Sequence, residues 1–304
     1  MGITIREAYG QALVELGKNP NIIVLDADLA KATKTIGFKK VCPERFFDMG
    51  ISEQDMIGTA AGLATCGKIP FATTFAIFAV GRAFEQIRNS VAYPNLNVKI
   101  VGTHGGVTVG YDGGSHQAIE DIALMRCLPN MVILNPADAM ETKQIVHAAA
   151  EYYGPVYIRV SRIETPVIHD ERYKFTIGKG EVVREGNDVA IIATGIMVAK
   201  ALEAADILAL EGIMATVVNI STIKPLDKEL IIKVAQRAGR VVTAEEHSVI
   251  GGLGAAVCEV LSQEQPTKTT LIGIQDKFGC SGSPDELLAH YKLTALDIAQ
   301  AAKS

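Results

Sequence analysis

The sequence predicts an α/β protein with two doubly wound domains, each built on a mostly parallel sheet. Short apolar runs alternate with helix-period segments along the 304 residues. Several of these runs are apolar without alternation, which is typical of strands that helices cover on both faces. A charged stretch over residues 163–188 interrupts the alternation, which then resumes. Strand–helix alternation on both sides of such a break predicts two layered α/β units.

The expected elements follow one another in a regular order. Ten runs are predicted strands, at residues 21–28, 45–51, 68–75, 97–104, 130–136, 155–161, 188–195, 214–220, 239–245 and 269–275. Helical periodicity predicts helices at residues 1–17, 52–67, 81–93, 116–127 and 137–152. We therefore expect a first domain over 1–165, a linker over 166–188 and a smaller second domain over 189–304.

Composition and charge exclude several classes of protein. Hydrophobic residues make up 48% and charged residues 21% of the chain, as in a globular protein. The net charge of −5 argues against nucleic-acid binding, which needs a clustered basic face. Five scattered cysteines, none in a C-x-x-C pair, indicate reduced thiols and a cytoplasmic location. The apolar run at 71–80 is half the ~20 residues that span a bilayer, so no membrane contact is expected.

Polar and aromatic residues follow the predicted strands of the first domain. In open α/β sheets, ligands bind beyond the carboxyl ends of the strands. The residues after the first four strands are Asp26 and Asp28, Glu53, Phe75 and Phe78, and His104. We expect a ligand cleft along this edge, although the phenylalanines alone fit a core equally well. The second domain offers little of this kind beyond Glu245, Glu246 and His247, so the chemistry is placed in the first domain.

Glu53 begins a helix with unusually small side chains. Ser52 is expected to cap this helix, with Asp55 completing a capping box. Gly58 and Gly62 leave a surface on which another helix, such as a symmetry mate, can pack closely. From these residues alone, Glu53 is explained most simply as a charge that complements the helix dipole.

A glycine-rich loop over residues 103–121 is the most informative stretch. It holds five glycines, which permit left-handed conformations and close approach of a ligand. His104, Asp112 and His116 supply donors and acceptors for a polar substrate. Since such loops in compact α/β domains are usually functional, we favour a substrate site over a passive surface loop. The spacing of these residues does not fit a zinc site.

Seven motifs follow one another over nearly the whole chain. They read ADLAKATKT, MGISEQDMIGTAAGLA, TTFAIFAVGRAFEQIR, THGGVTVGYDGGSHQAIEDIALMRCLPNMVILNPAD, RVSR, ISTIKPLD and TAEEHSVIGGLG. In this order they resemble the transketolase family, which includes the 1-deoxyxylulose-5-phosphate synthases. The resemblance implies a thiamine-diphosphate pyrimidine-binding domain followed by a transketolase-type C-terminal domain.

The resemblance assigns four residues to the cofactor thiamine diphosphate. Glu53 matches the carboxylate that hydrogen-bonds a ring nitrogen of the aminopyrimidine and controls its tautomer, a role that replaces the dipole explanation. Phe75 and Phe78 match the aromatic residues that stack around the pyrimidine, where an apolar face suits a flat ring. Asp28 matches an acidic residue near the thiazolium.

A second set of residues is assigned to the substrate. His104, Asp112 and His116 match residues that bind the hydroxyls of the sugar and assist proton transfer. Arg162 and Arg6 match arginines that bind the phosphate, a task that suits the planar guanidinium. The expected catalytic residues are Glu53, His104 and His116.

Two features depart from the family pattern. Gly81 stands near the position of a further aromatic residue of the pyrimidine pocket and is left without a role. The G-D-G motif of the module that binds the diphosphate and Mg²⁺ does not occur in the sequence. The resemblance therefore implies a separate N-terminal transketolase subunit that holds the diphosphate and Mg²⁺, and an α2β2 heterotetramer in which this chain also pairs with itself.

The activity implied is the transfer of a two-carbon ketol unit between sugar phosphates, as in the pentose phosphate pathway. Three alternatives stay open: a split enzyme similar to 1-deoxyxylulose-5-phosphate synthase, the β subunit of a 2-oxoacid dehydrogenase, and a non-catalytic partner subunit. The segments YDGGSHQ and HSVIGGLG favour a transketolase or synthase over the dehydrogenase. Retention of the whole set of expected site residues argues against a non-catalytic role.

Overall fold

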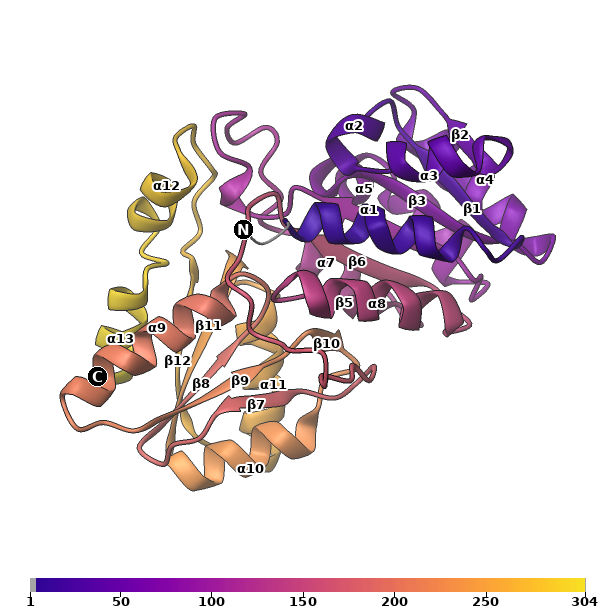
Figure 1. The fold of residues 1–304 in the computed structure, drawn as a ribbon. Coiled ribbons are helices and arrows are strands. Elements are labelled where there is room, and N and C mark those ends of the chain that lie inside the picture. The colour runs from indigo at the N-terminus through magenta and orange to yellow at the C-terminus, as the bar shows by residue number, and fades with distance from the viewer. Residues whose placement is uncertain (1–3, 304) are drawn as a thin grey trace.

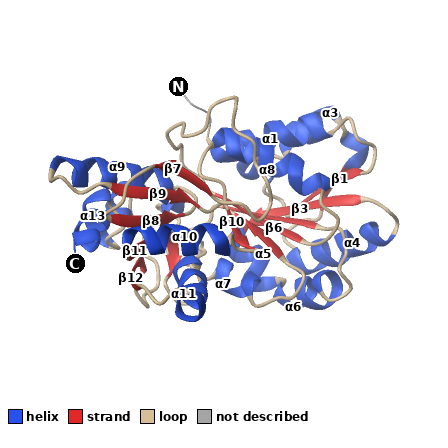
Figure 2. Cartoon of the chain, turned by 90° about the horizontal axis from the view of Figure 1, so that it is seen from below, coloured by secondary structure: helices blue, strands red, loops and turns tan. Residues whose placement is uncertain are grey.

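The apolar runs form two mostly parallel sheets, and helices cover both faces of each (Figures 1 and 2). The computed structural model describes residues 4–303. The predicted fold class is confirmed. No helix within these residues is long and apolar enough to cross a bilayer.

The first sheet has seven strands in the order β10-β5-β6-β4-β3-β1-β2. They are β1 (Ile22–Asp26), β2 (Phe46–Asp48), β3 (Ile69–Phe75), β4 (Lys99–Thr103), β5 (Val132–Leu134), β6 (Val156–Val160) and β10 (Thr222–Lys224). All pairings are parallel except that of β10 with β5. Strands β1, β4, β5 and β6 are buried at every residue, which explains why their sequences are largely apolar without alternation.

Helices pack on both faces of this first sheet. They are α1 (Ile5–Leu16), α2 (Ala30–Thr33), α3 (Ile36–Val41), α4 (Glu53–Thr65), α5 (Ala76–Arg82), α6 (Phe84–Gln86), α7 (Asp121–Arg126) and α8 (Ala139–Glu151). One hydrophobic cluster lies beneath α1, α3 and α8, and another beneath α4, α5 and α7 on the opposite face (Figure 2). Short turns complete the domain: η1 (Pro43–Arg45), the π-helical η2 (Ile87–Ala92) and the 3-10 turn η3 (Val107–Val109).

The second sheet has five strands in the order β12-β11-β8-β9-β7. They are β7 (Glu181–Arg184), β8 (Val189–Ala193), β9 (Ala215–Asn219), β11 (Arg240–Ser248) and β12 (Lys268–Ile274). Its helices are α9 (Met197–Leu210), α10 (Lys228–Ala238), α11 (Leu253–Glu264), α12 (Pro284–His290) and α13 (Ala295–Lys303). Helices α9 and α13 share one hydrophobic cluster with the first domain, whereas α10 and α11 cover a separate one.

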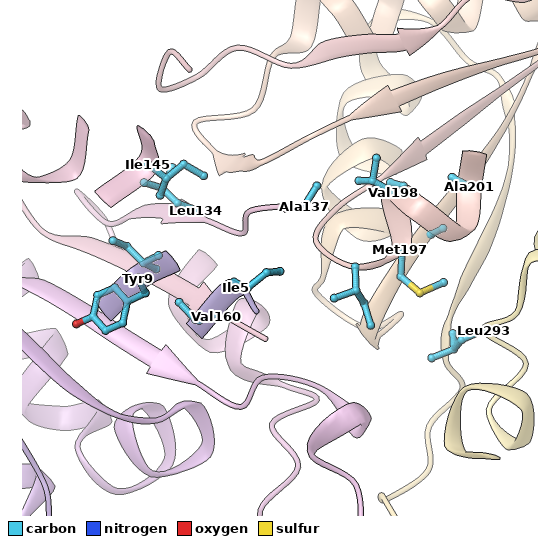
Figure 3. Close-up of a cluster of buried hydrophobic side chains, with 14 of the residues drawn as sticks. Ile5, Tyr9, Leu134, Ala137, Ile145, Val160, Met197, Val198, Ala201 and Leu293 are labelled. Carbon is cyan, nitrogen blue, oxygen red and sulfur yellow. The ribbon is translucent and has the colours of Figure 1, made fainter. Parts of the chain in front are cut away.

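The two domains are joined by more than the chain between them. Figure 3 shows one buried cluster that runs from Ile5 and Val160 in the first domain, past Ala137, to Met197 and Val198 in the second. Strand β10 belongs to the second half of the sequence but pairs with the first sheet. Strand β7 lies inside the expected linker. Its four residues are half-buried, and three of them (Glu181, Val182 and Arg184) pair with β9 as an antiparallel edge.

Local structure differs from the sequence prediction in three places. The helix expected from residue 116 begins only at Asp121, because Ala118 forms a β-bridge with Gly105 in the glycine-rich loop. The helix expected over 81–93 is divided between α6 and the π-helical turn η2. Ser52 makes no side-chain cap, because its backbone (φ −145°, ψ 65°) is held in a turn by an N–H bond to the carbonyl of Gly50.

Candidate active site

The register of three parallel strands brings the ends of β3, β4 and β6 together. Phe75 lies beside Thr103, which in turn lies beside Val160. His104 directly follows the middle strand, and Arg162 follows the third after one residue. The side chains that follow β3, β4 and β6 therefore meet at one edge of the first sheet, as the fold class predicts.

Four rings form the centre of this edge. The rings of Phe75 and Phe78 are stacked with centroids 5.8 Å apart and an interplanar angle of 17°. The imidazole of His104 lies 3.9 Å from the ring of Phe75, and that of His116 lies edge-on to Phe78 at 5.3 Å. Phe75 ends β3 and Phe78 lies in the first turn of α5, so one strand-to-helix junction positions both phenylalanines.

His104 is held in an unusual, buried position. Its backbone is left-handed, with φ 59°, and the residue is 2% exposed. Thr103 Oγ1 lies 2.9 Å from Nδ1, and Arg6 Nη1 lies 3.4 Å from Nε2. Burial, and then the charges of Arg6 and Arg162, lower the pKa of His104 to about 3. The imidazole is therefore neutral near pH 7, and the strained backbone is typical of functional positions.

Arg6 and Arg162 both lie near His104, and no carboxylate within residues 4–303 is bonded to both of them. Arg6 donates to the carbonyl of Ala32 at 3.0 Å, while its Nε is buried and has no hydrogen bond. Burial and then the charge of Arg162 lower the pKa of Arg6. Arg162 donates to Asp112 at 3.0 Å and to the carbonyl of Val109 at 2.5 Å. Two mutually repelling cations with a donor still unused are suited to binding an anion.

Glu53 lies in the wall of an open cavity of about 620 Å³, which is lined by residues 51–55 and Arg82. The residue is 4% exposed, and both of its carboxylate oxygens accept from Arg82 Nη1, at 3.1 and 3.3 Å. The guanidinium carbon of Arg82 also lies 4.2 Å from the ring centroid of Phe78. Arg82 thus joins the carboxylate to the ring cluster.

Sequence reasoning missed Arg82, although a signal for it was present. Phe78 and Arg82 are four residues apart, which places them on one face of α5. The neighbouring Gly81, which was left without a role, has open space beside it. A Cβ added there would meet only Ile77 Cδ1, at 4.0 Å.

Asp28 lies apart from the ring cluster. It is exposed, has φ 61°, and its backbone N–H donates to Asp48 Oδ1 at 3.1 Å. It lines a different cavity, of about 470 Å³, together with residues 29–32, Ile36 and Lys39. Nothing in the arrangement of residues 4–303 joins it to the four rings, so the expected role of Asp28 near a thiazolium stays a prediction.

The residues present suit one part of thiamine diphosphate. A buried carboxylate beside two stacked phenylalanines offers a hydrogen-bond acceptor and an apolar face to a flat nitrogen ring. Within the described part of the chain, no group of three histidine, cysteine or acidic side chains is arranged to hold a metal ion. The site therefore fits the aminopyrimidine, and the described residues show no centre for a diphosphate-bound metal.

Comparisons with known proteins match both domains. The family model described as transketolase, pyrimidine binding domain, matches residues 1–167, and that of the transketolase C-terminal domain matches 178–298. A putative transketolase C-terminal section from Methanocaldococcus jannaschii is 54% identical over 97% of this chain and 94% of that protein. The 6-deoxy-6-sulfo-D-fructose transketolase subunit SqwH from Clostridium sp. (strain MSTE9) is 44% identical over 98% and 93%.

A solved structure is also similar over its whole length. It is described as a split gene transketolase, inactive beta4 tetramer, and is 57% identical to this chain. The two superpose with a TM-score of 0.92 over 100% of this chain and 98% of the other. At 57% identity, the two proteins are similar in sequence as well as in fold.

Proposed function

Since the chain belongs to the transketolase family, we propose that it is the pyrimidine-binding subunit of a split transketolase that acts on sugar phosphates. The reaction is the transfer of a two-carbon ketol unit from a ketose phosphate to an aldose phosphate. One observation carries the proposal: the ring of Phe75 lies against both Phe78, which Arg82 links to Glu53, and His104, which lies near the two arginines. Phe75 therefore belongs both to the proposed cofactor-binding face and to the surroundings of the arginines that are proposed to bind an anion.

On the cofactor side, this chain orients a ring. Glu53 accepts a hydrogen bond from a pyrimidine nitrogen and holds the proton at that atom, while Phe75 and Phe78 provide the apolar face. Arg82 keeps the carboxylate at the cavity wall through its ion pair. When bound, thiamine diphosphate supplies the carbanion chemistry of the reaction.

On the substrate side, the chain binds hydroxyls and a terminal anion. His104 is neutral near pH 7, since its pKa is about 3, and acts as a hydrogen-bonding group to the sugar. His116 and Asp112 extend the same loop and complete the contacts to the hydroxyls, with His116 assisting proton transfer. Arg162 and Arg6 bind the phosphate, and the unused Nε of Arg6 is one donor for it.

A second chain completes the enzyme. We assign the diphosphate and Mg²⁺ to an N-terminal transketolase subunit, and we expect an α2β2 assembly. The names of the relatives support this division, since one is called a C-terminal section and another a subunit. The split-gene protein of 57% identity is described as an inactive β4 tetramer. All five cysteines are free thiols, which supports a location in the cytoplasm.

Reconstitution tests this function. The purified chain is assayed with xylulose 5-phosphate and ribose 5-phosphate, at saturating thiamine diphosphate and Mg²⁺, with and without the candidate N-terminal subunit. We expect turnover only when both chains are present. Full turnover by this chain alone contradicts the split assembly. A stable complex of both chains that turns over no sugar phosphate contradicts the proposed reaction.

A further inference from the structure

A carboxylate of the second domain lies directly beneath the glycine-rich loop of the first. Glu246 belongs to β11 and is 2% exposed, yet its Oε1 accepts the backbone N–H of Thr108 at 2.5 Å. Gly106 (φ 85°) lies so close above it that an added Cβ would come within 2.2 Å of the carboxylate carbon. The loop backbone is therefore fitted onto this one side chain, at a turn that only glycine adopts without strain.

The base of the loop is tied to the same strand. Arg159 Nη2 donates to the carbonyl of Glu246 at 2.9 Å and to that of Ala118 at 3.1 Å. Its Nε donates to Asp121 at 2.9 Å. Arg159, at the end of β6, thus joins the second domain to the point where the loop returns to the sheet.

A second segment of the C-terminal domain holds the outer part of the loop. Gln117 Nε2 donates to the carbonyls of Val107 and Cys280, at 3.0 and 2.9 Å. Ser281 Oγ donates to the carbonyl of Tyr111 at 2.8 Å. The bond from Ser281 ends on loop backbone, whereas the bond to Cys280 is made by the loop side chain of Gln117, so the C-terminal segment holds the loop at two points.

The loop held in this way carries the substrate residues. His104 precedes the turn above Glu246, and Asp112 and His116 follow it. The carbonyl of Val109, one residue from the anchored N–H of Thr108, accepts from Arg162. A shift of this turn therefore moves every group assigned to the sugar, while Glu53, on a separate helix, is left in place.

We infer that Glu246 is a positioning residue for the sugar-binding loop, and that holding this loop is a task of the C-terminal domain. The role of the loop rests on the proposed function, whereas the anchoring rests on the contacts above. Burial raises the pKa of Glu246 to about 7, and the charge of Arg159 opposes this shift. In its ionised form, this buried carboxylate accepts the loop N–H in the stronger, charge-assisted kind of hydrogen bond.

The adjacent Glu245 is a matched control. It is equally buried, and burial raises its pKa to about 7 as well. Its oxygens accept from the backbone N–H groups of Leu253 and Gly254, at 2.7 and 2.8 Å, within its own domain. Truncation of either glutamate removes a buried carboxylate of the same strand, but only one of them contacts the loop.

The test compares Glu246→Ala and Glu245→Ala by hydrogen–deuterium exchange of the backbone amides of residues 105–118 in the isolated chain. Loss of a bond to a charged acceptor predicts that these amides exchange about 10- to 100-fold faster in Glu246→Ala. We expect Glu245→Ala to leave them unchanged. Glu246→Gln keeps an acceptor in place and is expected to restore most of the protection.

In the reconstituted enzyme, Glu246→Ala is expected to raise the KM for sugar phosphates about ten-fold or more. Binding of thiamine diphosphate and exchange at its thiazolium carbon should stay at the wild-type level, which a general loss of structure would not allow. Gly106→Ala disturbs the same contact from the loop side and is expected to give the same pattern, also where Glu246→Ala does not fold.

Three outcomes overturn the inference: unchanged loop exchange in Glu246→Ala, equal acceleration in Glu245→Ala, or faster loop exchange with an unaltered KM. Failure of the proposed function is seen separately, because the wild-type complex would then turn over no sugar phosphate. In that case the exchange of residues 105–118 still decides whether Glu246 anchors the loop.

Discussion

The two halves of the candidate site are built in different ways. On the cofactor side, Glu53 lines an open cavity, and its cationic partner Arg82 is half exposed. On the substrate side, His104 is buried, and the backbone of its loop is bonded to both domains of the chain. The position of the glycine-rich loop is therefore fixed by contacts within this chain. The cofactor side, in contrast, is open to solvent.

This difference separates the roles of the two domains. The open side offers a carboxylate and two rings to the cofactor, which under the proposed function a second chain also holds. The closed side uses the C-terminal domain as its support. Changes on the cofactor side should thus be detected in the assembled enzyme, and changes in the loop should already be detected in the isolated chain.

The largest expected effect tests the cofactor side. In Glu53→Gln, the amide cannot hold the proton at the pyrimidine nitrogen as a carboxylate does. We expect a loss of turnover of ~10²–10⁴ in the reconstituted enzyme, the range of general acid–base effects. The measurement is turnover together with hydrogen–deuterium exchange at the thiazolium carbon, with circular dichroism to establish folding.

Asp55→Asn is the matched control for this variant. Asp55 also lies in the first turn of α4 and lines the same cavity, so both changes remove one negative charge from the helix start. If Glu53 only complemented the helix dipole, the two variants would behave alike. Wild-type exchange at the thiazolium carbon in Glu53→Gln would remove this residue from the mechanism.

A smaller effect is expected on the substrate side, at Arg162. Arg162→Ala loses a charge-assisted contact, which predicts a KM for phosphorylated sugars about 10- to 100-fold higher. An unphosphorylated donor such as hydroxypyruvate should be affected much less. Steady-state kinetics with both donors make the comparison.

Arg162→Lys sharpens the same comparison, since it retains the charge but not the planar guanidinium. We expect it to recover part of the affinity for phosphorylated sugars, because the phosphate is still attracted. Equal losses with both kinds of donor would show that Arg162 acts by holding Asp112 and the loop, to which it is bonded.

The smallest expected effect is on stability and needs no partner. The pKa of His104 is about 3 in the folded chain, below its ordinary value of 6.5. Between these two pH values the unfolded chain binds a proton that the folded chain does not, so stability falls as the pH drops. At one pKa unit per ~1.4 kcal/mol, we expect wild type to lose about 2 kcal/mol relative to His104→Asn between pH 6.5 and 4.5.

Urea unfolding at a series of pH values measures this difference. The free energy of unfolding that is lost with the imidazole ring itself does not depend on pH. It therefore does not affect how the difference in stability between the two proteins changes with pH. Parallel stability curves for wild type and His104→Asn would show that the histidine is not buried in a cationic environment, and the contrast between the closed loop and the open cavity would be lost.

Much of the fold was predictable because it depends on local pattern. Apolar runs predicted every strand except β7 and β10, and the resemblance matched Phe75 and Phe78 to aromatic residues that stack around the pyrimidine. The resemblance to transketolases, based on seven motifs in order, is confirmed by the two family models and by close relatives. The expected helix start at residue 116 and the cap by Ser52 were wrong, since each depends on a backbone contact outside its own turn.

By itself, the sequence determined which residues of the first domain follow strands and hence which side chains lie along the ligand edge. Only the tertiary structure decided their partners. The ion pair of Glu53 with Arg82, the two arginines near His104, and Glu246 beneath Gly106 each join residues between 29 and 140 positions apart. Hydrophobic periodicity predicts which residues share a face of one helix or strand. The partners of a buried charge depend on the other elements that pack around it. For this reason Glu246 had no evident role in the sequence, yet it lies beneath the loop that carries the residues proposed to bind the substrate.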